Sequence, residues 1–173
     1  MELSEAIKGR RSIRAFKKQH VPEEIVEKLI NAASWAPSAG NIQPWEFVIV
    51  RKPAVKKRLA QAALNQEFVE EAPVVIVVCA DEERSSMGYS FRGRTLYCIQ
   101  DTAAATQNIL LTAYSLGLGA CWIGAFNEDE AKKAVNAPEE IRPMAILPVG
   151  YPNETPSQRH RIPLSQIMHY ETF

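Results

Sequence analysis

A dense group of hydrogen-bond donors lies near the start of the chain, at Arg10, Arg11, Ser12 and Arg14. Guanidinium groups bind phosphate through paired hydrogen bonds, and a hydroxyl adds a neutral donor. In an extended backbone Arg10, Ser12 and Arg14 would share one face, because side chains alternate along a strand. Arg11 would then face the other way. The stretch is therefore a candidate site for one phosphate, and the alternative is a solvated, charged connector.

Other stretches have residue types that suit a ligand. Residues 37–45, PSAGNIQPW, hold hydroxyl and amide groups on a loop with two prolines, which suits a planar ligand with polar edges. Residues 119–126, GACWIGAF, are rich in small residues, so a ring could stack close to their backbone. Arg159 and Arg161 could complete a phosphate site from the C-terminal tail. The alternatives are an ordinary helix-to-strand loop and a buried strand with a core tryptophan.

Charge and composition narrow the kind of partner. Lysine plus arginine equals aspartate plus glutamate at 20 each, and a zero net charge argues against a nucleic-acid binder. The three cysteines are far apart, without a CxxC pair, and the three histidines lack metal-ligand spacing. We therefore expect buried free thiols in a reducing compartment and no metal site. No signal-peptide pattern or long apolar run is present, so we expect a cytoplasmic protein without a membrane span.

The elements that must position these residues follow from the apolar periodicity. Helices are expected over residues 3–9, 22–36, about 53–63, 127–137 and a long stretch from about 95 that ends at Gly117 or Gly119. Strands are expected over 45–51, 72–80 and 143–152, with a short strand or extended loop over 119–126. Residues 81–94 are polar and contain glycine, which predicts a mobile loop, and 153–173 form a proline-containing tail.

These elements predict a single α+β domain over residues 1–173, because helices and strands alternate without a regular βαβ series. The long helix is apolar on more than one side, so it should be buried nearly all round. One short chain has little to cover such a helix. Homodimerisation is therefore our hypothesis for how it is buried.

Taken together, the chain resembles the nitroreductase family of FMN-dependent NAD(P)H oxidoreductases. The segments that carry the resemblance are RRSIR (10–14), APSAGNIQPWEF (36–47), APVVIVV (72–78), RGRTLYCIQDTAAATQNILLTAYSLGLGACWIG (92–124) and the stretch from VGYP through the tail arginines (149–163). The resemblance implies an α/β sandwich with a mixed, mostly antiparallel sheet. It also implies an intertwined homodimer with the long helix at the dimer interface and two FMN molecules between the subunits.

The resemblance also implies roles for particular residues. The FMN phosphate would be bound by Arg10, Ser12 and Arg14 with Arg161 and Arg159, while Arg11 would meet the cofactor through its backbone. The flavin and ribityl would be flanked from the partner subunit by Pro37, Ser38, Ala39 and Asn41. Either Asn65 or Gln66 would hydrogen-bond the pyrimidine edge of the ring, and Ile123 and the backbone of Gly124 would lie near flavin N5.

The activity implied is transfer of two electrons from NADH or NADPH to an oxidised acceptor, such as a nitroaromatic or a quinone, by a ping-pong hydride mechanism. The alternatives are another branch of the superfamily (a dehalogenase, an enone or azo reductase, or a flavin-fragmenting enzyme) and a non-catalytic flavin-binding protein. Two positions depart from larger members of the family. Phe68 stands where they carry a lysine, and Gly124 stands where many carry an acidic residue.

Overall fold

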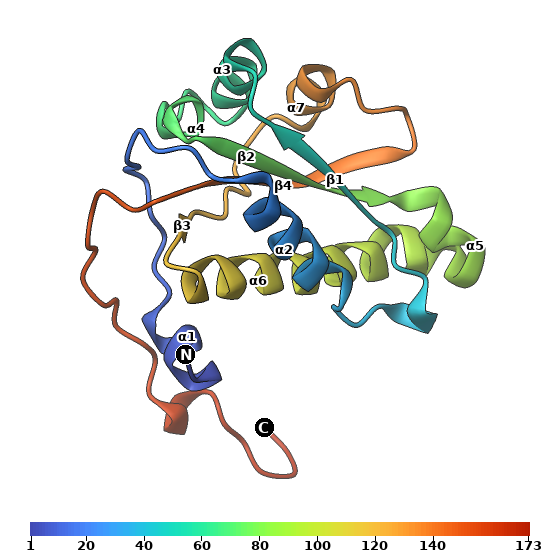
Figure 1. The fold of residues 1–173 in the computed structure, drawn as a ribbon. Helices are drawn as coiled ribbons and strands as arrows, with labels where there is room; N and C mark the ends of the chain where they lie inside the picture. The colour runs from blue at the N-terminus through green and yellow to red at the C-terminus, as the bar shows by residue number, and fades with distance from the viewer.

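The computed structural model describes all 173 residues, and its centre is one antiparallel sheet (Figure 1). The strands follow in the order β1 (Trp45–Val50), β2 (Val74–Asp81), β4 (Ile141–Gly150) and β3 (Gly119–Ala120). β2 and β4 are nearly continuous apolar runs because they are central and covered on both faces. A parallel bridge from Ser12 to Ala120 extends the sheet beyond β3. The mixed, mostly antiparallel sheet that the sequence predicted is thus confirmed.

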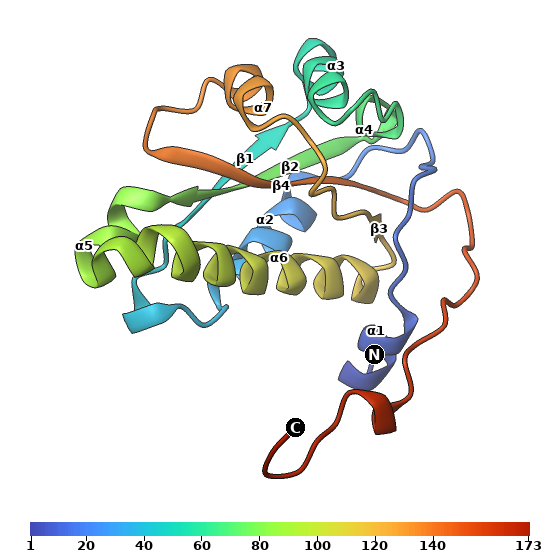
Figure 2. The same ribbon diagram turned by 180° about the vertical axis from the view of Figure 1, so that it is seen from behind.

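Helices cover both faces of the sheet, which makes three layers (Figures 1 and 2). One face is covered by α2 (Glu23–Ser34) and α6 (Cys98–Ser115), and the other by α3 (Pro53–Ala62), α4 (Phe68–Glu71) and α7 (Glu128–Val135). β2 alternates between the two cores, with Ile76 in the first and Val77 in the second. α1 (Leu3–Gly9) lies outside these layers. No helix is long and apolar enough to cross a membrane.

The ends of the helices follow the capping signals in the sequence. The Asn127 side chain accepts a hydrogen bond of 3.0 Å from the backbone N–H of Glu130 at the start of α7. α6 ends at Ser115, and the φ of 76° at the following Gly117 lets the Leu118 N–H reach back to the Ala113 carbonyl at 2.8 Å. The predicted bounds of these helices are therefore close to those observed. α4 was not predicted, because its four residues are too few to show a period.

The mobile loop predicted over residues 81–94 is wrong, because this segment is helical. α5 spans Glu82–Arg92, and a π-helical turn, labelled η2, spans Gly93–Tyr97 and leads directly into α6. The Asp81 side chain caps α5 by accepting from the Arg84 N–H at 2.8 Å. The polar composition hid the helix, and its end is irregular: Ser90 has a φ of 50°, which interrupts the helical pattern.

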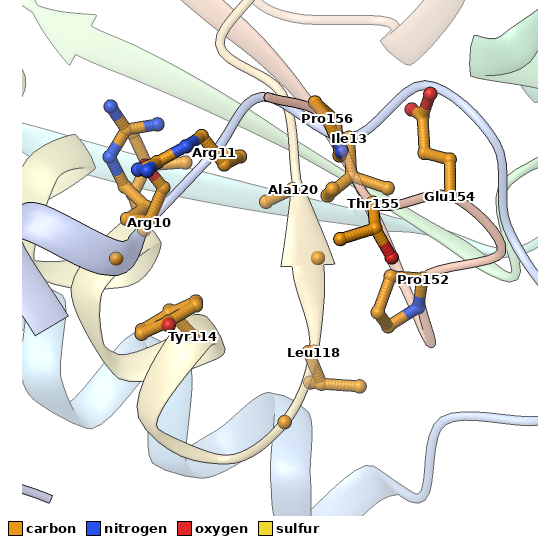
Figure 3. A pocket seen from close by; sticks show the side chains of 14 residues that line it. Arg10, Arg11, Ile13, Tyr114, Leu118, Ala120, Pro152, Glu154, Thr155 and Pro156 are labelled. Atoms are coloured by element: carbon orange, nitrogen blue, oxygen red, sulfur yellow. The ribbon is translucent and has the colours of Figure 1, made fainter. Parts of the chain in front are cut away.

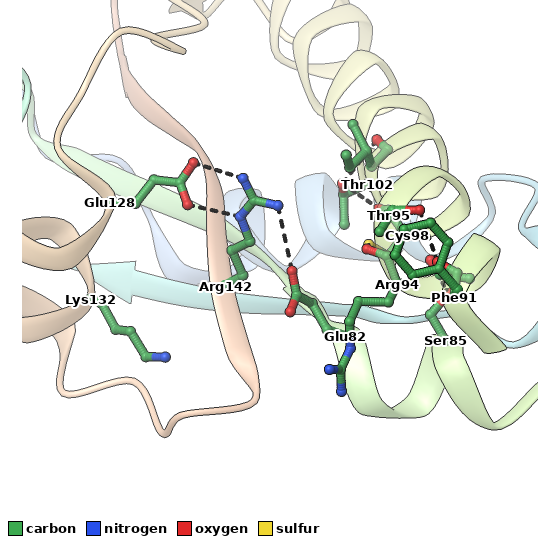
Figure 4. Close-up of polar contacts among 12 residues, drawn as sticks. Glu82, Ser85, Phe91, Arg94, Thr95, Cys98, Thr102, Glu128, Lys132 and Arg142 are labelled. Atoms are coloured by element: carbon green, nitrogen blue, oxygen red, sulfur yellow. Dashed lines mark hydrogen bonds and ion pairs between the residues drawn. The ribbon is translucent and has the colours of Figure 1, made fainter.

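Polar contacts fix α5 to the sheet and to α7 (Figure 4). Arg142 on β4 donates to both carboxylate oxygens of Glu128 at 2.8 and 2.9 Å, and to Glu82 at 3.4 Å. These acids begin α7 and α5, so one guanidinium holds two helix N-termini. The Ser85 hydroxyl also donates to the Gly93 carbonyl at 2.9 Å, which closes the turn between α5 and α6.

The expectation that the long helix is buried nearly all round is wrong for the isolated chain. Ile99, Gln100 and Gln107 of α6 are exposed, while its opposite side packs on α2 and the sheet. The tail after Gly150 is also exposed. It carries uncovered apolar side chains at Ile162, Leu164, Ile167, Met168, Tyr170 and Phe173. The three cysteines, by contrast, are buried free thiols, as the sequence predicted.

Candidate functional site

The arginine-rich segment lies along the edge of the sheet beside β3. The Ile13 N–H donates to the Ala120 carbonyl at 3.0 Å, and this hydrogen bond holds the segment's backbone in an extended conformation. Ile13 is buried and lies directly over Gly119, where a Cβ would come within 2.6 Å of the isoleucine Cγ1. Since side chains alternate along an extended backbone, the neighbours Ser12 and Arg14 turn away from this contact.

Arg10, Ser12 and Arg14 gather around the thiol of Cys121. Burial raises the pKa of this thiol, while the charge of Arg14, a hydrogen bond with Ser12 and the charge of Arg10 act to lower it. Arg11 folds back instead, and its Nη1 donates to the carbonyls of Lys8 at 2.6 Å and Arg10 at 3.0 Å. The structure therefore brings Ser12 and Arg14 together beside Cys121 with Arg10 nearby, while Arg10 also lines a cavity together with Arg11.

The guanidinium groups at this place have no carboxylate partner. Neither Arg10 nor Arg14 forms an ion pair, unlike Arg142 between its two glutamates. Arg14 lies over the ring of Phe68, with 6.0 Å from its Cζ to the ring centroid. Glu154 approaches the segment, but it accepts from the main-chain N–H groups of residues 14 and 15. The side-chain donors are thus free to hold a small anion.

The tail arginines are not brought to this place within one chain. No hydrogen bond or ion pair joins Arg159 or Arg161 to the arginine segment, and both are exposed. Arg161 Nη1 donates only to the carbonyls of Arg159 at 3.3 Å and His160 at 3.1 Å. Their role as phosphate ligands stays a prediction.

A second group of predicted contacts lies near the arginine segment. Asn65, in the turn between α3 and α4, is exposed with a φ of 61°, and its side chain forms no hydrogen bond. The neighbouring Gln66 amide instead donates to the Ala63 carbonyl at 2.8 Å. Phe68 under Arg14 belongs to this same turn region. Of the two candidates left open by the sequence, Asn65 is the one with a free amide group.

The stretch that follows β3 offers an open backbone. Ile123 is buried and exchanges backbone hydrogen bonds of 3.0 and 3.1 Å with Ile146 of β4. Gly124 beside it is exposed, and a Cβ there would find its nearest atom, Trp122 Nε1, 4.0 Å away. The Asn127 N–H donates to the Ala62 carbonyl at 2.8 Å, which ties this stretch to the end of α3 near Asn65.

The loop with Pro37, Ser38, Ala39 and Asn41 lies at the other end of the molecule (Figure 1). Its one-turn 3₁₀ helix spans Ala39–Asn41, and the Ser38 hydroxyl accepts from the Gln43 N–H at 3.0 Å. The loop contacts the start of α6, whereas β3 follows its end. From Asp101, which the loop contacts, the helix runs 14 further residues to Ser115, roughly 21 Å at about 1.5 Å per residue. One chain therefore does not bring the two halves of the predicted site together.

The cavity shown in Figure 3 lies on the Ile13 side of the arginine segment and has a volume of about 420 Å³. It is enclosed by the end of α1, the end of α6 with Tyr114 and Leu118, and the start of the tail. Arg10 and Arg11 line it, but Ser12, Arg14 and Gly124 do not. The cavity is therefore not the place where most of the predicted cofactor contacts meet.

Two residues at these places were missed by the sequence analysis. Glu154 binds backbone N–H groups next to the free arginines. Asp101 on α6 is only 6% exposed, and its Oδ1 accepts from the Ala39 N–H at 3.1 Å. Burial raises the pKa of this carboxyl, and the hydrogen bond from Ala39 opposes the shift. An aspartate that is the only charged residue of the long helix was the one sequence signal that could have indicated it.

Comparisons with known proteins agree on one family. The model described as "Nitroreductase family" matches residues 7–67 and 62–151. A protein of Methanothermobacter thermautotrophicus, provisionally described as an NADH dehydrogenase/NAD(P)H nitroreductase, is 37% identical over 163 residues, covering 92% of this chain and 82% of that protein. The FMN reductase (NADPH) of Bacillus subtilis is 30% identical, covering 98% and 73%. The NADPH:FMN oxidoreductase of Vibrio harveyi, complexed with NAD⁺, superposes with a TM-score of 0.91 at 29% identity, covering 99% of this chain and 77% of the other.

Proposed function

Because the chain belongs to the nitroreductase family, we propose that it is an oxidoreductase that uses FMN to move two electrons from NADH or NADPH to an oxidised small molecule. The observation that carries the proposal is the group of free donors around Cys121. Arg10 and Arg14 offer guanidinium groups without carboxylate partners, and Ser12 offers a hydroxyl between them. Such a set suits a single phosphate, and FMN carries one.

The chain also offers suitable residues for the flavin ring, the other half of an FMN molecule. A flavin has a hydrogen-bonding pyrimidine edge, and Asn65 has a free amide on a fixed turn near Arg14. A planar ring needs room close to a backbone, and the space above Gly124 is open. The donor set and the open backbone therefore fit the group that the family implies.

The activity follows from what these residues would do with the cofactor. Bound FMN supplies the hydride chemistry, since it accepts two electrons from a nicotinamide and returns them to an acceptor. Arg10, Ser12 and Arg14 would bind the phosphate, and Asn65 would orient the ring edge. The backbone of Gly124, without a side chain, would leave the reacting face accessible to a nicotinamide and to the acceptor in turn. This alternation supports a ping-pong mechanism, and no protein acid or nucleophile is needed.

A second copy of the chain would complete the site. The loop at residues 37–43 and the arginine segment lie at opposite ends of α6, so the loop would reach a flavin bound by the partner. The tail has six exposed apolar side chains that a partner surface would cover. Light scattering at micromolar concentration should give the mass of a dimer. A mass near 19.3 kDa, that of one chain, would contradict this arrangement.

The function is tested first by the colour of the protein. After reconstitution with FMN and removal of free cofactor, the protein should show the visible absorption bands of a flavin. Under anaerobic conditions NADH or NADPH should bleach these bands, and adding a quinone or nitroaromatic should restore them. A protein that retains no FMN contradicts the whole assignment, whereas bound FMN that neither nucleotide bleaches indicates a flavin-binding protein without this activity.

A further inference from the structure

The loop at residues 38–43 is held in an unfavourable conformation. Gly40, Asn41 and Gln43 all have φ values between 55° and 56°, and two of them are not glycine. Such left-handed backbone conformations persist only where the surroundings enforce them, and they concentrate at binding sites. The question is which contacts hold this loop in place.

Four contacts fix the loop from outside its own turn. Ile42 packs on Gly88 of α5, where a Cβ would lie 2.3 Å from the isoleucine Cδ1. The ring of Tyr89 packs on Gly40 in the same way, with 2.8 Å from a Cβ to the tyrosine hydroxyl. The third is the hydrogen bond from the Ala39 N–H to Asp101 on α6. The fourth is the hydrogen bond that Arg84 Nη1 of α5 donates to the Gln43 carbonyl at 3.0 Å. Of these two polar contacts, the one to Asp101 holds the first residue of the loop's 3₁₀ turn.

A carboxylate is energetically unfavourable at the buried position of Asp101. It is 6% exposed, and its second oxygen, Oδ2, is buried without a hydrogen-bond partner. A buried carboxylate with an unsatisfied oxygen lowers the stability of the fold. Its presence is therefore not explained by stability, while its Oδ1 supplies the acceptor for the Ala39 N–H.

We propose that Asp101 is a positioning residue that pins the 38–43 loop, through the Ala39 N–H, in the conformation that contacts the cofactor. The inference rests on the proposed function, because that function places Pro37, Ser38, Ala39 and Asn41 against FMN. Asp101 acts through the main chain of the loop and touches no reacting atom. What the role requires is an acceptor at Oδ1; a negative charge at Oδ2 is not required.

Two variants at this position separate the acceptor from the charge. Asp101→Asn keeps an oxygen for the Ala39 N–H and removes the charge. Asp101→Leu keeps the approximate shape and removes the acceptor. In FMN-free protein, hydrogen exchange of the segment that contains Ala39 should be about tenfold faster or more in the leucine variant, and close to wild type in the asparagine variant. Titration of FMN, followed by quenching of its fluorescence, should give a Kd raised about tenfold or more for leucine and within about threefold of wild type for asparagine.

Thr106→Val is the matched control on the same helix. Thr106 is buried, and its hydroxyl donates to the Thr102 carbonyl at 2.8 Å, away from the loop. This variant should lower thermal stability while the exchange of the loop and the Kd for FMN stay as in wild type. A Kd raised as much as in Asp101→Leu would show that disturbing α6 is sufficient, and would overturn the proposal.

Further outcomes separate a failure of this inference from a failure of the proposed function. Equal FMN affinity in wild type and Asp101→Leu would overturn the inference and leave the proposed function intact. If the leucine variant does not fold, Asp101→Ala, which removes the same acceptor with a smaller side chain, takes its place with the same expected rises in exchange rate and Kd. In Asp101→Asn, a Kd raised tenfold or more would show that the charge matters and would overturn the proposal. If wild-type protein binds no FMN, the proposed function fails, while the exchange experiment still reports on the pinned loop.

Discussion

Replacing Arg14 with alanine is expected to weaken FMN binding by about 1–3 kcal/mol, which raises the Kd roughly 5- to 150-fold. Arg14 is one of the three donors around Cys121, and no carboxylate competes for its guanidinium. A phosphate bound there would lose a charge-assisted hydrogen bond. The measurement is a fluorescence titration of FMN into cofactor-free protein. Because the interaction is with a phosphate dianion, the loss should shrink as the salt concentration rises.

The control for this prediction is Lys57→Ala on α3. Lys57 is exposed and forms no hydrogen bond or ion pair, so its removal deletes one positive charge from the protein without touching the donors. Its Kd for FMN should stay within about twofold of wild type, a difference below about 0.5 kcal/mol. If Arg14→Ala binds FMN as tightly as Lys57→Ala does, Arg14 is not a phosphate ligand.

Replacing Gly119 with alanine should damage both the fold and the cofactor site. A Cβ at this position would lie 2.6 Å from Cγ1 and 2.7 Å from Cβ of Ile13, and the second atom belongs to the stiff base of the side chain. Overpacking of this kind costs about 1–3 kcal/mol of unfolding free energy. Ile13 would be pushed outward and would carry Ser12 and Arg14 with it. Urea unfolding of FMN-free protein and a subsequent FMN titration should therefore both show a loss.

Gly124→Ala is the stability control for this change. The nearest atom to a Cβ at Gly124 is 4.0 Å away, so the substitution should leave the unfolding free energy within about 0.5 kcal/mol of wild type. A Gly119→Ala protein as stable as this control would mean that the segment at Ile13 adapts without strain. If it were destabilised but bound FMN normally, the position of Ile13 would not determine that of the arginines.

The sequence predicted the elements whose signals are local. β2 begins with five β-branched residues in a row, and α7 begins at an asparagine cap followed by acids, so both lie close to where the pattern placed them. α5 was missed because its cap, Asp81, is followed by polar residues that show no apolar face. Its position also depends on the ion pair between Glu82 and Arg142, which are 60 residues apart. No local sequence pattern indicates such a pair.

The sequence proposed residues for the candidate site, and these stay a prediction; it did not show how one chain arranges them. The alternation of side chains along an extended backbone predicted that Arg11 would face away from Arg10, Ser12 and Arg14, but Arg10 and Arg11 line the same cavity. Nothing in the sequence revealed that the loop at 37–43 and the arginine segment are separated by the length of α6. The contact of Asp101 with Ala39 spans 62 positions, and a lone acidic residue in a helix indicates no particular partner.

Because the three cysteines are buried, their thiols resist oxidation. Burial raises the pKa of Cys79 to about 12 and raises the pKa of the Cys98 and Cys121 thiols as well. The thiolate is the form that peroxide and alkylating reagents attack, so at neutral pH these sulfurs stay largely inert while the chain is folded. Reduced flavins pass electrons to oxygen and release peroxide. A flavin bound as proposed above could therefore release peroxide beside these thiols without converting them to sulfenic acid.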